Sequence, residues 1–110
     1  MSLTFSTNSL KWNLPEGQNI VKITNDTKQN FAIKVKSTNA EIYSTAPVTE
    51  IIKAGYVLNL VVVRKKGPMK DEKLAIHYVE VEPTEIDAAE VFKKPKITPN
   101  VFMITMKCEE

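Results

Sequence analysis

The chain has 110 residues, of which 43% are hydrophobic, and this suits one compact domain with its own core and leaves no room for a second. Only 3 glycines, a charged fraction of 25% and the lack of a low-complexity tract exclude fibrous and disordered proteins. With 15 basic and 13 acidic residues the formal net charge is +2, too balanced to predict a nucleic-acid-binding protein. We therefore expect a single domain over residues 1–110.

Signals for a membrane or an oxidising compartment are not found in the sequence. The first residues, Met1 to Ser6, contain no basic start followed by an apolar core, so no signal peptide is predicted. The longest apolar run, within residues 56–63, is too short to cross a bilayer. A single cysteine, Cys108, cannot form an internal disulfide and fits a reducing compartment. We expect a cytoplasmic protein without a transmembrane segment.

An early edge strand is predicted before residue 15. Leu10, Trp12 and Leu14 alternate with polar residues, as in a strand that has one buried face. Residues 15–17 then supply a proline and a glycine, which favour a turn. The strand should therefore end at this turn.

Residues 18–38 contain two alternating runs on either side of a polar break at residues 25–30. Val21 and Ile23 share one face of the first run, and Phe31, Ile33 and Val35 share one face of the second. This period of two predicts two paired or neighbouring β-strands, each with one buried face. The opposite side carries Lys22, Lys34 and Lys36. We expect these lysines on one outer face of a sheet.

A change of sheet is predicted near Pro47. Proline cannot donate a hydrogen bond to a central ladder, so a short strand that switches between sheets fits residues 39–47. Another short strand is expected over residues 48–53, before a turn at Ala54 and Gly55. Residues 56–63 are apolar at every even position and at most odd positions, which predicts a central strand.

The last part of the chain predicts two more strands and one helix. Residues 73–78 alternate between large apolar side chains and polar or small ones, and residues 101–106 form a closing strand. After Pro83, helical spacing and an acidic first turn predict a short helix near Asp87 to Phe92. Solvated basic loops are expected at residues 64–66 and 93–96.

These elements together predict an all-β protein, a seven-stranded immunoglobulin-like β-sandwich with one short helix. The Cys, Trp and Cys spacing of true immunoglobulin domains is absent. The prediction therefore rests on the number of strands and on their alternation.

The sequence predicts no catalytic residue, no cofactor and no metal site. With one histidine and one cysteine, neither a multi-histidine site nor a four-ligand zinc cage can be assembled. No serine lies in a G-x-S-x-G elbow, and no glycine-rich phosphate loop is present. His77 is expected near Lys73 on the wet side of a strand, as a solvated imidazole. The protein is not expected to be an enzyme.

The strand lysines allow two interpretations. In the first, Lys22, Lys34 and Lys36, with Lys73 from a neighbouring strand, form a cationic face that docks an acidic peptide or an anionic surface. In the second, they are only the polar residues that any wet strand face carries. The residues alone leave both interpretations open.

Several segments in a fixed order carry a family resemblance. They are Val21 to Asn25, Phe31 to Asn39, Tyr43, Pro47, Ile51, Ile52 and Gly55, and then, more weakly, Lys73 to Ile76, Ala89 to Phe92 and Val101 to Met103. This series resembles the major sperm protein domain, found in nematode sperm proteins and in the membrane-anchored VAP proteins. The family implies a seven-stranded immunoglobulin-like sandwich that acts through protein-protein contacts instead of catalysis. Without a coiled coil or a membrane anchor, the chain most resembles the small sperm-specific relatives.

The resemblance implies two functions. Major sperm proteins self-associate into dimers and filaments that drive amoeboid sperm, which implies a self-associating protein or an accessory of that cytoskeleton. The VAP branch instead binds acidic, phenylalanine-containing peptides through a basic face, and this is the alternative function. The expected partners are therefore proteins, either a second copy as a homodimer or an acidic peptide, and not nucleic acid.

Matching the motifs of the VAP branch gives the candidate peptide-binding face. Its residues are Lys34, Lys36, Ser37, Thr38, Lys73 and Ala75. At position 75 the branch has a methionine, so Ala75 implies the loss of one apolar wall of the phenylalanine pocket.

Overall fold

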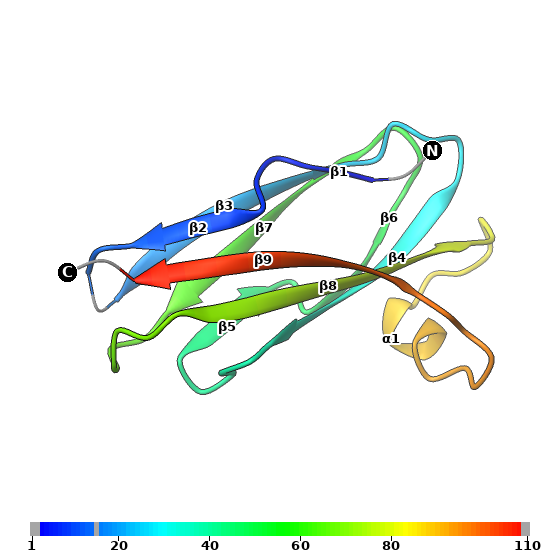
Figure 1. The fold of residues 1–110 in the computed structure, drawn as a ribbon. Helices are drawn as coiled ribbons and strands as arrows, with labels where there is room; N and C mark the ends of the chain where they lie inside the picture. Colours follow the sequence, from blue (N-terminus) through cyan, green and yellow to red (C-terminus); the bar gives the residue numbers. More distant parts are fainter. Residues whose placement is uncertain (1–2, 15, 109–110) are drawn as a thin grey trace.

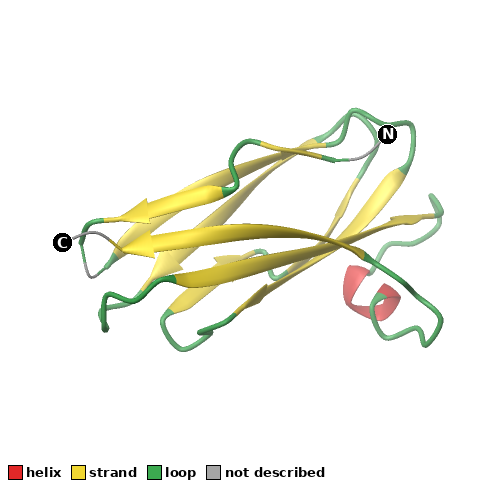
Figure 2. Ribbon diagram, in the orientation of Figure 1, coloured by secondary structure: helices red, strands yellow, loops and turns green. Residues whose placement is uncertain are grey.

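Two β-sheets pack face to face in the computed structural model, which describes residues 3–14 and 16–108 (Figure 1). The four-stranded sheet has the order β1-β3-β7-β5, and the five-stranded sheet has the order β2-β9-β8-β4-β6. The strands are β1 (Thr4–Phe5), β2 (Ser9–Trp12), β3 (Gly17–Thr24), β4 (Asn30–Ser37), β5 (Tyr43–Ala46), β6 (Thr49–Ile52), β7 (Val57–Arg64), β8 (Glu72–Val81) and β9 (Asn100–Cys108). Apart from one short helix, the described chain consists of these strands and their connecting loops (Figure 2). The predicted all-β sandwich is confirmed.

Four of the strands are short and lie on either side of a change of sheet. The early edge strand is divided into β1, which pairs with β3, and β2, which runs parallel to β9. The two short strands predicted on either side of Pro47 belong to different sheets, because β5 pairs with β7 whereas β6 pairs with β4. The predicted change of sheet near Pro47 is therefore confirmed.

The early edge strand is shorter than its alternation predicts. Leu14 is 65% exposed and lies beyond β2, since the ladder with β9 ends at the pair formed by Trp12 and Cys108. Residue 15, the first position of the predicted turn, lies outside the described residues. The alternation in the sequence thus extends beyond the last residue that has a partner strand.

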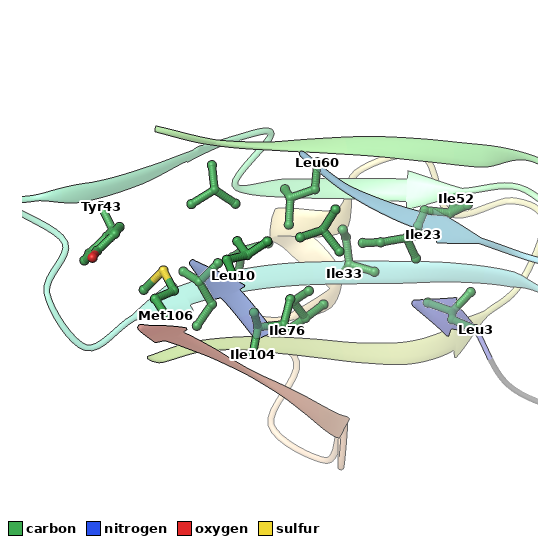
Figure 3. Packing of buried hydrophobic residues seen from close by; sticks show 14 of the residues in the cluster. Leu3, Leu10, Ile23, Ile33, Tyr43, Ile52, Leu60, Ile76, Ile104 and Met106 are labelled. Atoms are coloured by element: carbon green, nitrogen blue, oxygen red, sulfur yellow. The ribbon is translucent and has the colours of Figure 1, made fainter. Parts of the chain in front are cut away.

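The core lies between the sheets, where alternate residues of each strand point inward. Every predicted core residue of β3 and β4 is at most 6% exposed, namely Val21, Ile23, Phe31, Ile33 and Val35. Figure 3 shows side chains of the two sheets meeting in this space, with Leu60 on one side and Ile76 and Ile104 on the other. Burial of this apolar surface is the main force that holds the sheets together.

The polar break after β3 carries the chain from one sheet to the other. Asn25 is 0% exposed, and its side-chain amide donates hydrogen bonds to the carbonyls of Gln29 (2.8 Å) and Ile52 (2.9 Å). Its Oδ1 accepts hydrogen bonds from the backbone N–H and the hydroxyl of Thr27, at 3.1 Å and 2.7 Å. These bonds satisfy the polar groups of a chain that crosses between sheets instead of folding into a hairpin.

The pairing predicted for the two alternating runs is therefore wrong. β3 pairs with β1 and β7, whereas β4 pairs with β6 and β8. Lys22 is exposed on the outer surface of the four-stranded sheet, and Lys34 and Lys36 lie on the outer surface of the five-stranded sheet. The expected single face of three lysines does not exist, because the two sheets lie on opposite sides of the core and their outer surfaces point in opposite directions.

The helix α1 (Ala88–Val91) covers one end of the outer surface of the five-stranded sheet (Figure 1). Asp87 caps it, because its carboxylate accepts a hydrogen bond from the backbone N–H of Ala89 at 3.0 Å. Ala88 and Val91 pack on Ala32, which is 0% exposed although it points away from the main core. The helix predicted near Asp87 to Phe92 is confirmed.

Two isoleucines of β3 test this arrangement, because they lie on the same strand and differ in burial. Ile23 is 0% exposed, whereas Ile20 is 55% exposed. We expect Ile23→Ala to lower the free energy of unfolding by about 2–5 kcal/mol, because it opens a cavity in the core. Ile20→Ala should cost less than about 1 kcal/mol. Urea denaturation of both variants measures this, and equal losses would contradict the assignment of the two faces.

Candidate functional site

Three lysines and an apolar strip, formed by Val101 and Met103, share the part of the five-stranded sheet that α1 leaves uncovered. Strand pairing sets its rows across β4, β8 and β9, which are Lys34–His77–Val101, Lys36–Ala75–Met103 and, on β8 and β9 alone, Lys73–Thr105. We call these eight residues the basic face. Their side chains point outward because the residues between them, such as Val35, Leu74 and Ile104, fill the core.

The positive charge of the basic face is not neutralised within the described chain. Its eight positions include no aspartate or glutamate. Within residues 3–14 and 16–108, Lys34, Lys36 and Lys73 form no ion pair, whereas Lys93 and Lys94 are paired with Glu90 and Glu85. A surface with this composition attracts acidic groups over a distance comparable to the Debye length.

The positive charge of the basic face also affects the pKa of His77. Its predicted position on the wet side of a strand is confirmed, since it lies between Lys34 and Val101 in the first row. Partial burial lowers the pKa of His77 below its usual value of 6.5, and the charges of Lys36 and then Lys34 lower it further. The imidazole is consequently neutral at pH 7.

Exposed apolar side chains lie on β9, one strand beyond β8 from the lysines of β4. Val101 is 48% exposed and Met103 is 46% exposed, and both belong to β9. The sequence analysis placed them in a closing strand but did not recognise them as site residues. The signal was present, because they alternate with Phe102 and Ile104, so one of the two apolar sets had to face outward.

Met103 lies close to position 75, where the VAP branch has a methionine and this chain has an alanine. The register places it opposite Ala75 on the neighbouring strand. An exposed thioether therefore lies next to the small alanine side chain, within the apolar strip.

The six candidate residues from the sequence divide into two groups. Lys34, Lys36, Lys73 and Ala75 lie together on the basic face. Ser37 instead lies opposite Leu74, on the other side of its strand, and its Oγ accepts a hydrogen bond from the backbone N–H of Asn39 at 3.1 Å.

Thr38 lies just beyond the end of β4. Its hydroxyl donates to Glu72 Oε1 at 2.8 Å and accepts from the backbone N–H of Lys73 at 3.0 Å. Thr38 therefore fixes the connection between β4 and β8, and both its hydroxyl contacts are with the chain itself.

Arg64 is buried, so the solvated loop expected at residues 64–66 is wrong at its first position. Arg64 is 1% exposed, ends β7 and continues the inward alternation of Val62. Its Nη2 donates to the carbonyls of Gly67 (3.0 Å) and Pro68 (2.7 Å), and its Cζ lies 5.1 Å from the ring centroid of Tyr43. It acts as a structural cation that holds the loop after β7 against the core.

A metal centre and a membrane-spanning helix find no support in the described residues. Between residues 3 and 108, leaving out residue 15, no three His, Cys, Asp or Glu side chains gather in a way that would hold a metal ion. No helix in this part of the chain has the length and apolar composition needed to cross a membrane.

Comparison with known proteins places this fold in a family. The family model for the MSP (Major sperm protein) domain matches residues 3–100. Sperm-specific class P protein 32 of Caenorhabditis elegans is 36% identical over 77 residues, which covers 70% of this chain and 72% of that protein. The structure of WR4, a C. elegans MSP family member, superposes with a TM-score of 0.88 at 26% identity and covers 97% of both chains. SSP-19, an MSP-domain-like protein of the same organism, gives the same TM-score of 0.88 at 22% identity, covering 97% of this chain and 99% of that one. The chain belongs to the major sperm protein domain family.

Proposed function

We propose that this domain is a non-enzymatic protein-protein interaction module of nematode sperm, and that it binds acidic segments of its partners through the basic face. The observation that supports this most is the combination of unpaired lysines with an exposed apolar strip. The sperm-specific relatives support the cell type, and the cytoplasm is the compartment in which such a module would meet its partners.

Charge and apolar contact have different roles in this binding. Val101 and Met103 are each about half exposed, so burying the rest of either side chain contributes at most about 1.5 kcal/mol, half the upper value for a fully exposed side chain. A solvent-exposed ion pair contributes only about 0.2–1 kcal/mol and weakens with salt. The apolar strip thus supplies the part of the affinity that salt does not weaken, while the lysines select acidic partners and speed their encounter.

The mode of binding follows from the strand pairing of the face. Its rows lie on paired strands, so an acidic segment can lie across β8 and β9 with apolar side chains on Val101 and Met103 and carboxylates toward Lys34 and Lys36. A contact limited to the eight residues of the basic face suits a weak, reversible interaction.

Self-association, or an accessory role in the major sperm protein cytoskeleton, is a second candidate function. An acidic segment of the kind that the basic face requires is present in the chain itself, at residues 80–87. Family membership supports this candidate as well.

Charge reversal on the two sheets gives a matched test of the proposed face. We expect Lys36→Glu to weaken binding of a synthetic acidic peptide with two phenylalanines by about tenfold, because it places like charges together. Lys22→Glu changes the net charge equally but lies on the other sheet, and should leave the affinity nearly unchanged. Fluorescence anisotropy at low and physiological salt measures both. Equal effects of the two substitutions would refute the proposed face.

The pH dependence of binding should depend on His77. Carboxylates docked on the face raise the pKa of His77 above its lowered value in the unbound domain, so proton uptake accompanies binding. Affinity should therefore increase as the pH falls below about 6.5, while peptide carboxylates stay ionised above about pH 5. We expect His77→Gln to flatten this profile between pH 7.5 and 5.5. A profile unchanged by the substitution would show that His77 lies outside the contact.

A further inference from the structure

At the end of the sandwich that carries α1, β8 extends beyond its partner β9. The ladder between the two strands ends at the pair formed by Tyr78 and Asn100, whereas β8 continues to Val81. The chain that leads from α1 into β9 runs apart from this end of β8 (Figure 1). Among the described residues, the last part of β8 therefore has β4 as its only partner strand. We call residues 79–81 the free edge of β8.

The backbone of Glu80 is unpaired on the free edge. The carbonyl of Lys73 faces β4, since it accepts a hydrogen bond from the backbone N–H of Thr38 at 3.0 Å. Backbone groups of successive strand residues point to alternate neighbours, so those of the even-numbered residues of β8, including Glu80, point to the side of β9. Within residues 3–14 and 16–108, Glu80 has no backbone partner on that side. An exposed edge of this kind can pair with a further strand.

A hollow of about 620 Å³ lies beside the free edge. Val79 and Val81 supply its apolar lining from β8, Val91 from α1 and Ile97 from the segment that follows the helix. Sites that bind ligands have volumes of about 300–1,000 Å³ and are lined mainly by apolar side chains. The hollow therefore has room for apolar side chains of a bound segment.

The charged residues that line the hollow are three glutamates and two lysines. Glu85 and Lys94 neutralise each other as an ion pair. Glu80 and Glu82 are exposed and form no ion pair or side-chain hydrogen bond in the described ranges, 3–14 and 16–108, and the same holds for Lys96. Two unpaired carboxylates thus face one unpaired lysine, and the remaining charge of the hollow is negative.

We infer that the free edge of β8 binds an extended segment of another protein in which apolar and basic residues alternate. Val79 lies on the outer side of the sheet opposite Ala32, whereas Glu80 lies on the other side opposite Phe31. Directly opposed residues of neighbouring strands share a side. A strand added here therefore places a lysine or arginine opposite Glu80, with apolar residues before and after it next to Val79 and Val81.

Two features of the site select this occupant. The unpaired N–H and C=O of Glu80 match the backbone of an extended segment, which is the basis of β-strand addition. The unpaired carboxylates of Glu80 and Glu82 match its basic residues. The run of this chain that alternates in the same way, residues 33–36, is already paired with β8, so the occupant is a different protein. This site is separate from the basic face, and the inference does not depend on the proposed function.

Two peptides test whether binding uses the strand edge. The probe is a fluorescein-labelled peptide with the core Lys-Val-Lys-Val-Lys between short glycine-serine ends. We expect its fluorescence anisotropy to show saturable binding to the wild-type domain, which weakens when salt is added. The second peptide is methylated on the backbone nitrogens of its three lysines. It keeps the charge but lacks the N–H groups of a ladder, so it should bind about tenfold more weakly.

Substitutions in the hollow test the role of its charges. Glu80→Gln/Glu82→Gln should weaken binding of the probe by about tenfold, because it removes two ion pairs without changing the shape of the side chains. Glu16→Gln/Glu41→Gln changes the net charge equally at exposed positions outside the hollow and should change the affinity by less than about twofold. Circular dichroism of each variant shows whether it has folded.

Two lysine variants should affect the same probe differently from the glutamate variant. Lys96→Gln should strengthen binding by about twofold, because it removes the unpaired lysine of the hollow. Lys36→Glu, on the basic face, should not weaken it. Hydrogen exchange measured by NMR gives a direct readout of the edge: the amide of Glu80 should exchange rapidly in the unbound domain and slowly when the probe saturates it.

Any of four results would overturn the inference. They are no binding of the probe at millimolar concentration, equal affinities of the two peptides, a glutamate variant that loses no more affinity than its control, and exchange at Glu80 that the bound probe leaves unchanged. The second and fourth would show attraction by charge without strand pairing, and the third would show binding elsewhere on the domain.

Discussion

The buried side chain of Asn25 holds the chain where it crosses between the two sheets, and the position of every later strand depends on this crossing. Its amide and carbonyl groups satisfy backbone and hydroxyl groups of three residues, Thr27, Gln29 and Ile52. Leaving such buried groups unsatisfied costs about 1–3 kcal/mol each. Because the chain changes sheet here, β4 pairs with β8, and the lysines of β4 come to lie on the same sheet surface as the apolar strip of β9, with β8 between them.

The same crossing places Lys22 on the outer surface of one sheet and Lys34 and Lys36 on the outer surface of the other, which the alternation in the sequence does not show. A strand face buried in the core fixes the opposite face as solvent-exposed, so each lysine follows the sheet to which its strand belongs. On the basic face Lys34 lies opposite His77 and Lys36 opposite Ala75, so no two lysines are directly paired across β4 and β8. This spacing limits the repulsion that directly opposed like charges would cause, while it keeps the surface positive.

Alternation of apolar and polar residues predicted which side chains are buried, and Pro47 predicted where a strand changes sheet. Alternation shows which side of a strand is buried, but it does not show which strand pairs with which. For this reason Lys22 was expected on the same sheet face as Lys34. It also fails at both ends of a strand: Leu14 continues the pattern where the ladder has stopped, and Arg64 belongs to the core despite its charge. The outward position of Val101 and Met103 was overlooked although the sequence contained a signal for it, because Thr105 and Lys107 follow them on the same face of β9, whereas Phe102, Ile104 and Met106 make the other face apolar.

Binding of acidic segments by the basic face is tested most directly by a ¹H–¹⁵N NMR titration of the wild-type domain with the acidic peptide. The predicted result is a set of shifted amides confined to β4, β8 and β9 around Lys36, Ala75 and Met103, with β3 around Lys22 unchanged. Shifts centred on the four-stranded sheet, or no shifts at peptide concentrations in the millimolar range, would contradict the assignment of this face as the binding surface.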